Sequence, residues 1–219
     1  LSGEKLLKYY LEQIFKIKIG ANTNNEIMEN YWIVNSDYPL RNQKHYKEVN
    51  IASAIVVIRN PVDVIMSSVL NAVDIPDAIE NVDGLIQQWK EFYRYWTNAP
   101  IPVFVVRYED LIISTEEILL QVARFLLGAK SMENSKLEYF VRKAVGSNPQ
   151  KELYAYDIEL EDDRILTPQV LTVLKTKFMS QLYKTMMKFN YEVNDNESET
   201  NWLLEFNKDN LVRAVDFHE

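Results

Sequence analysis

The sequence contains no cysteine, and only two histidines occur among its 219 residues. Without cysteine there is no disulfide framework, no zinc–thiolate site and no cysteine nucleophile. The scarcity of histidine, with His218 next to the last residue, makes a histidine metal site improbable. No apolar run approaches the roughly 20 residues that a membrane-spanning helix requires. We therefore expect neither a metal site nor a transmembrane segment.

Positive charge is also scarce, because 24 basic residues face 32 acidic ones and the net charge is −8. This balance argues against a nucleic-acid or anionic-membrane partner. Apolar residues make up 47% of the chain, enough for a sizeable core, and the length suits one α/β domain with or without an extension. The first residue is Leu1, so we expect a removed leader or a longer product. The compartment stays open, an organelle included.

The most informative stretch runs from residue 52 to residue 67. Residues 52–58 are a short apolar run rich in β-branched side chains, which predicts a parallel strand covered on both faces. Asn60 and Pro61 end the strand, and a helix can begin at the proline. Arg59 then lies at the carboxyl edge, where open α/β sheets bind ligands, and Ser67 lies about two turns into the helix. The pair could clamp a phosphate, or Arg59 could simply cap the strand end while Ser67 caps nothing.

Other segments show the apolar spacing of regular elements. Ser2 is a candidate N-cap for the first helix. Glu109 and Asp110 read as helix-start and packing residues, not as an acid/base pair. A connector is expected over residues 17–30. The expected helices cover residues 5–15, 83–98, 134–145 and 169–189, with another from Ser114 to the C-cap Gly128, and further strands cover 31–34 and 102–106.

The string Arg59-Asn60-Pro61-x-Asp63-Val64-x-x-Ser67 resembles the signature of sulfotransferases, which use the donor phosphoadenosine phosphosulfate (PAPS). In that family the matching arginine and serine hold the phosphate on the donor's ribose. The run from Ser2 and Gly3 to Glu12 resembles the phosphosulfate-binding loop and its helix, which cradle the anion. Similarity continues through residues 107–111, 166–168 and 190–192. It implies, for residues 1–192, a helix-rich α/β domain with a three-layer, P-loop-like parallel sheet.

Several positions depart from the family's pattern. Leu1 stands where the loop has a basic residue, and Glu4 follows Ser-Gly where a small hydroxyl or amide residue is usual. Asn35 and Asp37 replace the lysine and the catalytic histidine of a Lys-Thr-His-x-Pro segment, although residues 35–39 also read as a plain turn. No Arg-Lys-Gly triplet occurs over residues 151–163. A carboxylate about 4 Å from a phosphate costs roughly 4 kcal/mol at an effective dielectric near 20.

Two further features indicate other protein chains as partners. The strand that should precede the Ser2-Gly3 loop is absent from the sequence, which would leave two strand edges open. We expect another chain, or residues outside this sequence, to supply it. Residues 193–219 form an acidic linker followed by an amphipathic tail, which should dock on this domain or on a partner. The apolar residues of the tail are Trp202, Leu203, Leu204, Phe206, Leu211, Val212, Val215 and Phe217.

Three functions remain open at this point. The first, which we favour, is a sulfotransferase-like protein that has lost catalysis, needs no cofactor and acts as a structural or accessory subunit. The second is an active PAPS-dependent enzyme that sulfates a hydroxyl acceptor, with Asp37 or His45 as its base. The third is a module that binds adenosine bisphosphate through Arg59 and Ser67, with Ser2 and Gly3 at the second phosphate position.

Overall fold

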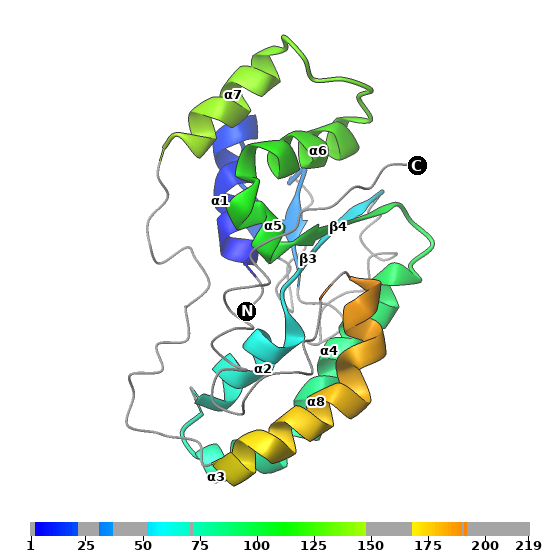
Figure 1. Ribbon diagram of the computed structural model, residues 1–219. Helices are drawn as coiled ribbons and strands as arrows, with labels where there is room; N and C mark the ends of the chain where they lie inside the picture. The colour runs from blue at the N-terminus through cyan, green and yellow to red at the C-terminus, as the bar shows by residue number, and fades with distance from the viewer. Residues whose placement is uncertain are drawn as a thin grey trace. The chain divides into compact units, whose positions relative to one another are not determined.

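The computed structural model describes residues 3–21, 31–36, 52–70, 72–147, 168–189 and 191 (Figure 1). The chain divides into two compact units that interleave along the sequence. The first unit contains Leu1–Ser2, Arg59–Glu91 and Tyr156–Glu219, and the second contains Gly3–Ile58 and Phe92–Ala155. The predicted boundary between residues 192 and 193 lies outside the described residues.

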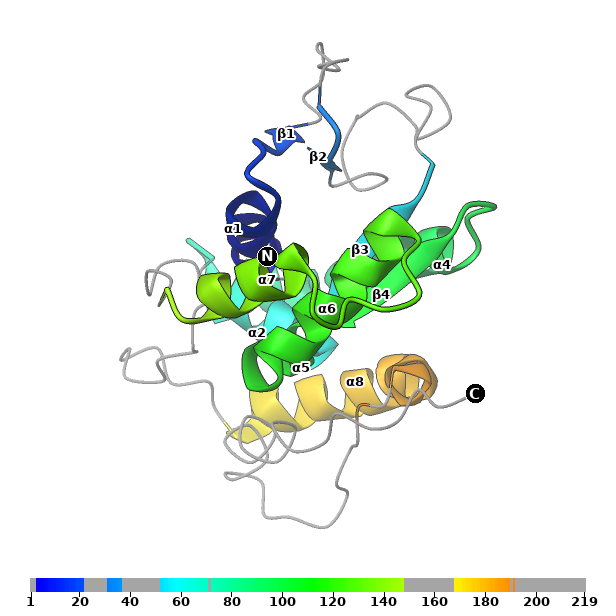
Figure 2. The same ribbon diagram turned by 90° about the horizontal axis from the view of Figure 1, so that it is seen from above.

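The second unit contains the parallel strands. Strand β3, Ala54–Ile58, pairs in parallel with β4, Val103–Arg107, so that Ile58 lies opposite Arg107 at the carboxyl edge. Strands β1, Gly20–Ala21, and β2, Val34–Asn35, form a second parallel pair (Figure 2). The chain is thus helix-rich and α/β with parallel strands. Among the described residues the two pairs do not join into one sheet, and the three-layer sulfotransferase sheet stays a prediction.

Two expectations at this end of the chain were wrong in detail. The strand expected over residues 31–34 covers only Val34–Asn35, and it pairs with Gly20–Ala21 inside the expected connector. Two-residue strands show no periodicity, so only their long-range pairing reveals them. The other helices and strands that were predicted follow the expected pattern closely, because caps and apolar spacing within each segment mark them.

Four helices of the second unit bury their apolar faces on one core. They are α1 (Glu4–Phe15), α5 (Tyr108–Ile113), α6 (Thr115–Leu127) and α7 (Lys136–Val145). Helix α1 packs along α7 (Figure 1). Each fully buried aliphatic side chain contributes about 1.5–3 kcal/mol relative to exposure. The buried core residues of these helices include Leu6, Leu7, Tyr10, Leu11, Ile14, Leu111, Leu119, Val122 and Val141.

The N-terminus of α1 differs from the prediction that Ser2 caps it. The N-cap residue is Gly3, with a left-handed φ of 77° and no side-chain cap. Its carbonyl accepts the N–H groups of Leu6 and Leu7 at 3.1 and 3.2 Å. A Cβ at Gly3 would lie 1.9 Å from the Cδ2 atom of Tyr108. Both the conformation and this close approach require glycine.

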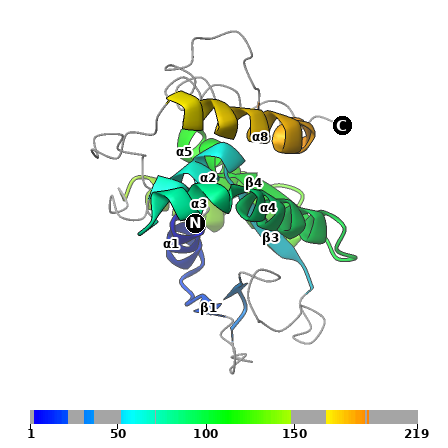
Figure 3. The ribbon, with the colours of Figure 1, turned by 90° about the horizontal axis from the view of Figure 1, so that it is seen from below.

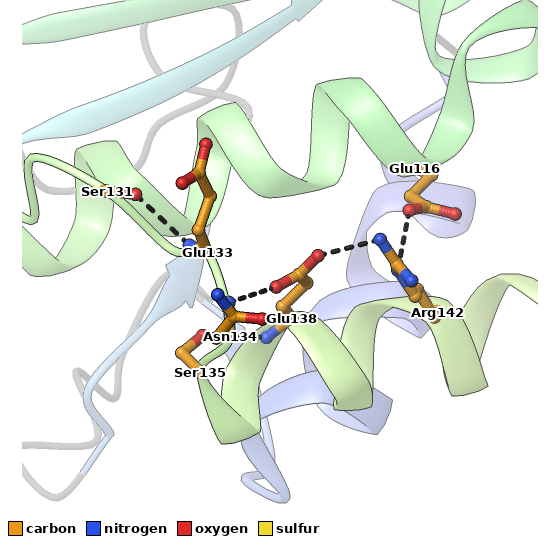
Figure 4. A network of polar contacts seen from close by, with 7 residues as sticks. All are labelled: Glu116, Ser131, Glu133, Asn134, Ser135, Glu138 and Arg142. Atoms are coloured by element: carbon orange, nitrogen blue, oxygen red, sulfur yellow. Dashed lines mark hydrogen bonds and ion pairs between the residues drawn. The ribbon is translucent and has the colours of Figure 1, made fainter.

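A polar network fixes α7 against α6 (Figure 4). Ser135 caps α7 by accepting the N–H of Glu138 at 3.0 Å, and Glu138 accepts the N–H of Asn134 at 2.6 Å. Arg142 donates to Glu138 at 2.8 Å and to Glu116 of α6 at 3.1 Å. The pairs are largely solvent-accessible, so each contributes about 0.2–1 kcal/mol and mainly fixes the orientation of α7.

The first unit contains α2 (Pro61–Leu70), α3 (Ile75–Glu80), the start of α4 (Val82–Thr97) and α8 (Pro168–Lys188) (Figure 3). Helix α3 was not predicted, although Asp74 caps it and Pro76 follows at its start. Asp83 of α4 accepts hydrogen bonds from Lys177 and Gln181 of α8, each at 2.7 Å. The buried face of α8 is formed by Leu174, Phe178, Leu182 and Met186. None of the helices described here has the length and apolarity to cross a membrane.

Candidate functional site

Arg59 follows β3 directly, as the sequence predicts, and begins the turn into α2. Its side chain is only 6% exposed. A guanidinium so deeply buried is held by polar or ionic interactions, and Arg59 makes such interactions in this structure. A ligand phosphate would have to reach a group that solvent barely touches. The burial fits the structural interpretation of Arg59, and the phosphate clamp stays a prediction.

Asn60 has a role that the sequence analysis missed. Its side chain is fully buried, and its Oδ1 atom accepts the N–H of Val62 at 3.0 Å. Its carbonyl accepts the N–H of Val64 at 3.1 Å, so Asn60 caps α2 with both its side chain and its backbone. The signal was present, because an asparagine before a proline at the first helical position is a helix-start pattern.

Ser67 lies in α2, one turn after Asp63 and half-buried. The helix places Val62, Ile65, Met66 and Val69 on its buried side. Asp63 stands in the first turn, where a carboxylate complements the helix dipole. The structure thus keeps the predicted strand–turn–helix order around Arg59 and Ser67. Both residues belong to the first unit.

The loop that resembles the phosphosulfate cradle belongs to the second unit, where Gly3 begins α1. Glu4 is the first helical residue, and its Oε1 atom accepts a hydrogen bond from Nδ2 of Asn35 at 3.2 Å. Asn35 is the last residue of β2. These are two positions at which the chain departs from the family's pattern, and the structure brings them into contact. Sequence reasoning did not predict this pair.

The Glu4–Asn35 pair places a carboxylate of the chain itself at the N-terminus of α1. Negative charge there is stabilised by the helix dipole, typically by about 0.3–1 kcal/mol. Donors at a helix N-terminus are the usual means of binding a phosphate. Here the carboxylate of Glu4 already occupies the position near the helix N-terminus at which negative charge is stabilised. The neutral amide of Asn35 satisfies one lone pair of Glu4 and adds no positive charge for an external anion.

Three predicted site positions lie outside the described residues: Ser2, Asp37 and the alternative base His45. The proposed base at Asp37 and the hydroxyl of Ser2 therefore stay predictions. The Lys151 region, where the family has its Arg-Lys-Gly element, also lies outside them. Within the part that is described, no group of three or more metal-ligating side chains comes together.

The carboxyl end of β4 carries a second polar group, formed by the Arg107-Tyr108-Glu109-Asp110 run. Helix α5 begins at Tyr108, and both acids lie in its first turn, which confirms their predicted helix-start role. Glu109 is buried, and Nε of Arg107 lies 3.8 Å from Oδ2 of Asp110. Burial raises the pKa of Asp110, Arg107 opposes this shift, and the charge of Glu109 adds to it. The group anchors the helix.

No protein-family model matches the chain, and no curated protein or solved structure is significantly similar to it. The resemblance to sulfotransferases consequently depends on the motifs around Arg59, Tyr108 and Gly3.

Proposed function

We propose that this chain is a sulfotransferase-like α/β protein that has lost catalysis and acts as a structural or accessory subunit of a larger assembly. The observation that carries the proposal is the hydrogen bond between Glu4 and Asn35 at the start of α1. A carboxylate and a neutral amide stand where the resemblance implies an anion-binding loop and a lysine. The chain thus supplies its own negative charge where the resemblance implies the donor's phosphosulfate.

The energetic consequence is large. A carboxylate about 4 Å from a phosphate costs roughly 4 kcal/mol at an effective dielectric near 20. Losing a lysine at a similar distance removes an attraction of comparable size. Each unfavourable change of this size lowers affinity about a thousandfold. The burial of Arg59 should lower the affinity for a phosphate further, because its guanidinium is scarcely accessible to a ligand.

The separation of the parallel strands supports an accessory role. Within the described residues, β1–β2 and β3–β4 are two independent pairs, although both belong to the second unit. Two-stranded pairs are marginal without further strands or helix packing. Open edges of this kind accept strands from other chains. A partner chain that extends either pair would fit the proposed role.

The test is calorimetric titration of adenosine bisphosphate into the purified protein and into a Glu4→Thr/Asn35→Lys double variant. We expect no detectable binding to the wild type and measurable binding to the double variant. The matched controls are the two single variants, Glu4→Thr and Asn35→Lys, and neither should bind, because each alone leaves the start of α1 without an available positive charge. Sulfate transfer from PAPS to any hydroxyl acceptor by the wild-type chain would refute the proposal.

An alternative is a module that binds adenosine bisphosphate without turnover. The strand–turn–helix order around Arg59 and Ser67 favours it, because this order is the one that the family's ribose-phosphate clamp uses. Micromolar binding by the wild type, lost in Arg59→Ala but retained when the exposed Lys188 at the end of α8 is replaced (Lys188→Ala), would establish this alternative in place of the accessory role.

A further inference from the structure

Helix α8 presents a second face that is exposed and carries no charge. Residues 173, 176, 180, 183 and 187 recur at alternating intervals of three and four, and all five are exposed. This spacing is typical of helices that pair along a seam. We call this row the outer seam of α8. Its residues are Val173, Thr176, Ser180, Tyr183 and Met187.

The outer seam concentrates apolar surface. Val173, Tyr183 and Met187 are 50%, 40% and 49% exposed, and they are three of the eight large hydrophobic residues exposed in the described part of the chain. The hydroxyls between them are satisfied by their own helix. Thr176 donates to the carbonyl of Thr172 at 2.9 Å, and Ser180 donates to that of Lys177 at 3.0 Å. The seam therefore needs an apolar partner and no polar one.

The lysines beside the outer seam favour a partner segment that is acidic. Helix α8 contains four lysines and no acidic residue. Residues 193–219, which follow it in the same chain, contain seven acidic and two basic residues, and residues 202–217 within them contain eight large apolar ones. The two segments are thus complementary in charge, and each has apolar side chains that need cover.

The chain length permits the two segments to meet. The outer seam extends over about 21 Å at 1.5 Å per residue. Helix α8 ends at Lys188, and residues 192–201 can extend up to about 33 Å when fully stretched. The apolar residues that begin at Trp202 can therefore reach any point of the seam from its C-terminal end. A linker this short also keeps the tail at a high effective concentration beside α8.

We propose that residues 202–217 pack along the outer seam of α8 in the same molecule, with the acidic residues of the tail beside Lys184 and Lys188. This docking goes beyond the accessory role proposed above and does not depend on it. It assigns the tail to a site on its own chain and leaves the strand edges of the second unit for partners.

The absence of native cysteine allows a clean cross-linking test on the full-length chain. Ser180→Cys is combined in turn with Leu204→Cys, Val212→Cys or Val215→Cys, and disulfide formation is followed under dilute, mildly oxidising conditions. The matched control replaces Ser180→Cys with Gln87→Cys, which is exposed on α4 of the same unit. We expect at least one seam pair to close within the monomer more than tenfold faster than its control.

A charge test complements the cross-link. Lys184→Glu/Lys188→Glu should slow the fastest seam pair severalfold, and added salt should slow the wild-type pair in the same way. Equal closure rates for seam and control pairs would overturn the proposal. Disulfides that form only between two molecules would also overturn it, because the tail would then dock on a second copy. Loss of adenosine bisphosphate binding or of an accessory role would leave these rates unchanged.

Discussion

Gly3 is the position at which we expect the addition of a single methyl group to lower the free energy of unfolding most. Gly3→Ala forces alanine into a φ of 77°, a left-handed conformation that costs about 1–2 kcal/mol for an L-residue. The new Cβ also lies 1.9 Å from Cδ2 of Tyr108. Tyr108 is buried in the core, so the ring cannot swing into solvent, and overpacking of this kind adds about 1–3 kcal/mol. We expect a total loss of about 2–5 kcal/mol.

Gly128 provides the matched control for this prediction. It caps α6 with a φ of 62°, and a Cβ there would meet nothing within 4 Å. Gly128→Ala should therefore cost only the backbone term of about 1–2 kcal/mol. Urea unfolding followed by circular dichroism measures both, and Tyr108→Leu should partly rescue Gly3→Ala. Equal losses for the two glycine variants would refute the role given to the Tyr108 contact.

Three other substitutions test the caps and the two perturbed carboxylates. Asn60→Ala removes the buried cap of α2 and should lower the free energy of unfolding by about 1–2 kcal/mol in a urea titration. Asn60→Asp keeps an oxygen that can accept the N–H of Val62 and should lose much less stability. Burial raises the pKa of Asp110 above 3.8, so stability should fall as the pH rises through that folded pKa. Asp110→Asn should remove this fall in unfolding experiments between about pH 3 and about pH 7, and an unchanged slope would contradict the assignment. Hydrogen bonds from Lys177 and Gln181 lower the pKa of Asp83 below 3.8, so its contribution should be present at neutral pH and lost as the pH falls through that lower value. Asp83→Asn should flatten this acidic part of the stability curve, and a wild-type slope in the variant would contradict the assignment.

The elements that the sequence predicted well are those whose signals are local. The apolar run before Arg59 and the proline after Asn60 mark β3 and the start of α2 within a few residues. Gly128 marks the end of α6 in the same way. Each of these boundaries depends on a cap, a backbone conformation or an apolar period within one segment. Packing against the rest of the chain reinforces them and does not create them.

The features that the sequence could not predict depend on contacts between distant residues. Strands β1 and β2 are two residues each, and only their pairing defines them. The contact of Gly3 with Tyr108 joins the start of α1 to the start of α5. The sequence around either residue gives no indication that the two lie next to each other. The outer seam of α8 could not be predicted from the sequence for a different reason. A helix with one buried and one exposed apolar face shows little amphipathicity, so its spacing reads as an ordinary core helix.

The Glu4–Asn35 hydrogen bond changes how the two departures should be interpreted. Taken one at a time, each residue would be compatible with the anion-binding loop that the resemblance implies, since Lys5 lies beside Glu4 and a lysine can be supplied from elsewhere. The contact shows that they form one arrangement, in which the amide of Asn35 holds the carboxylate of Glu4. Asn35→Lys alone would give a lysine that pairs with Glu4, and Glu4→Thr alone would leave the start of α1 without a nearby cation. Only the double variant gives an available positive charge at the helix N-terminus. Adenosine bisphosphate binding by the double variant and by neither single variant would show that Glu4 and Asn35 act together to prevent anion binding at the start of α1.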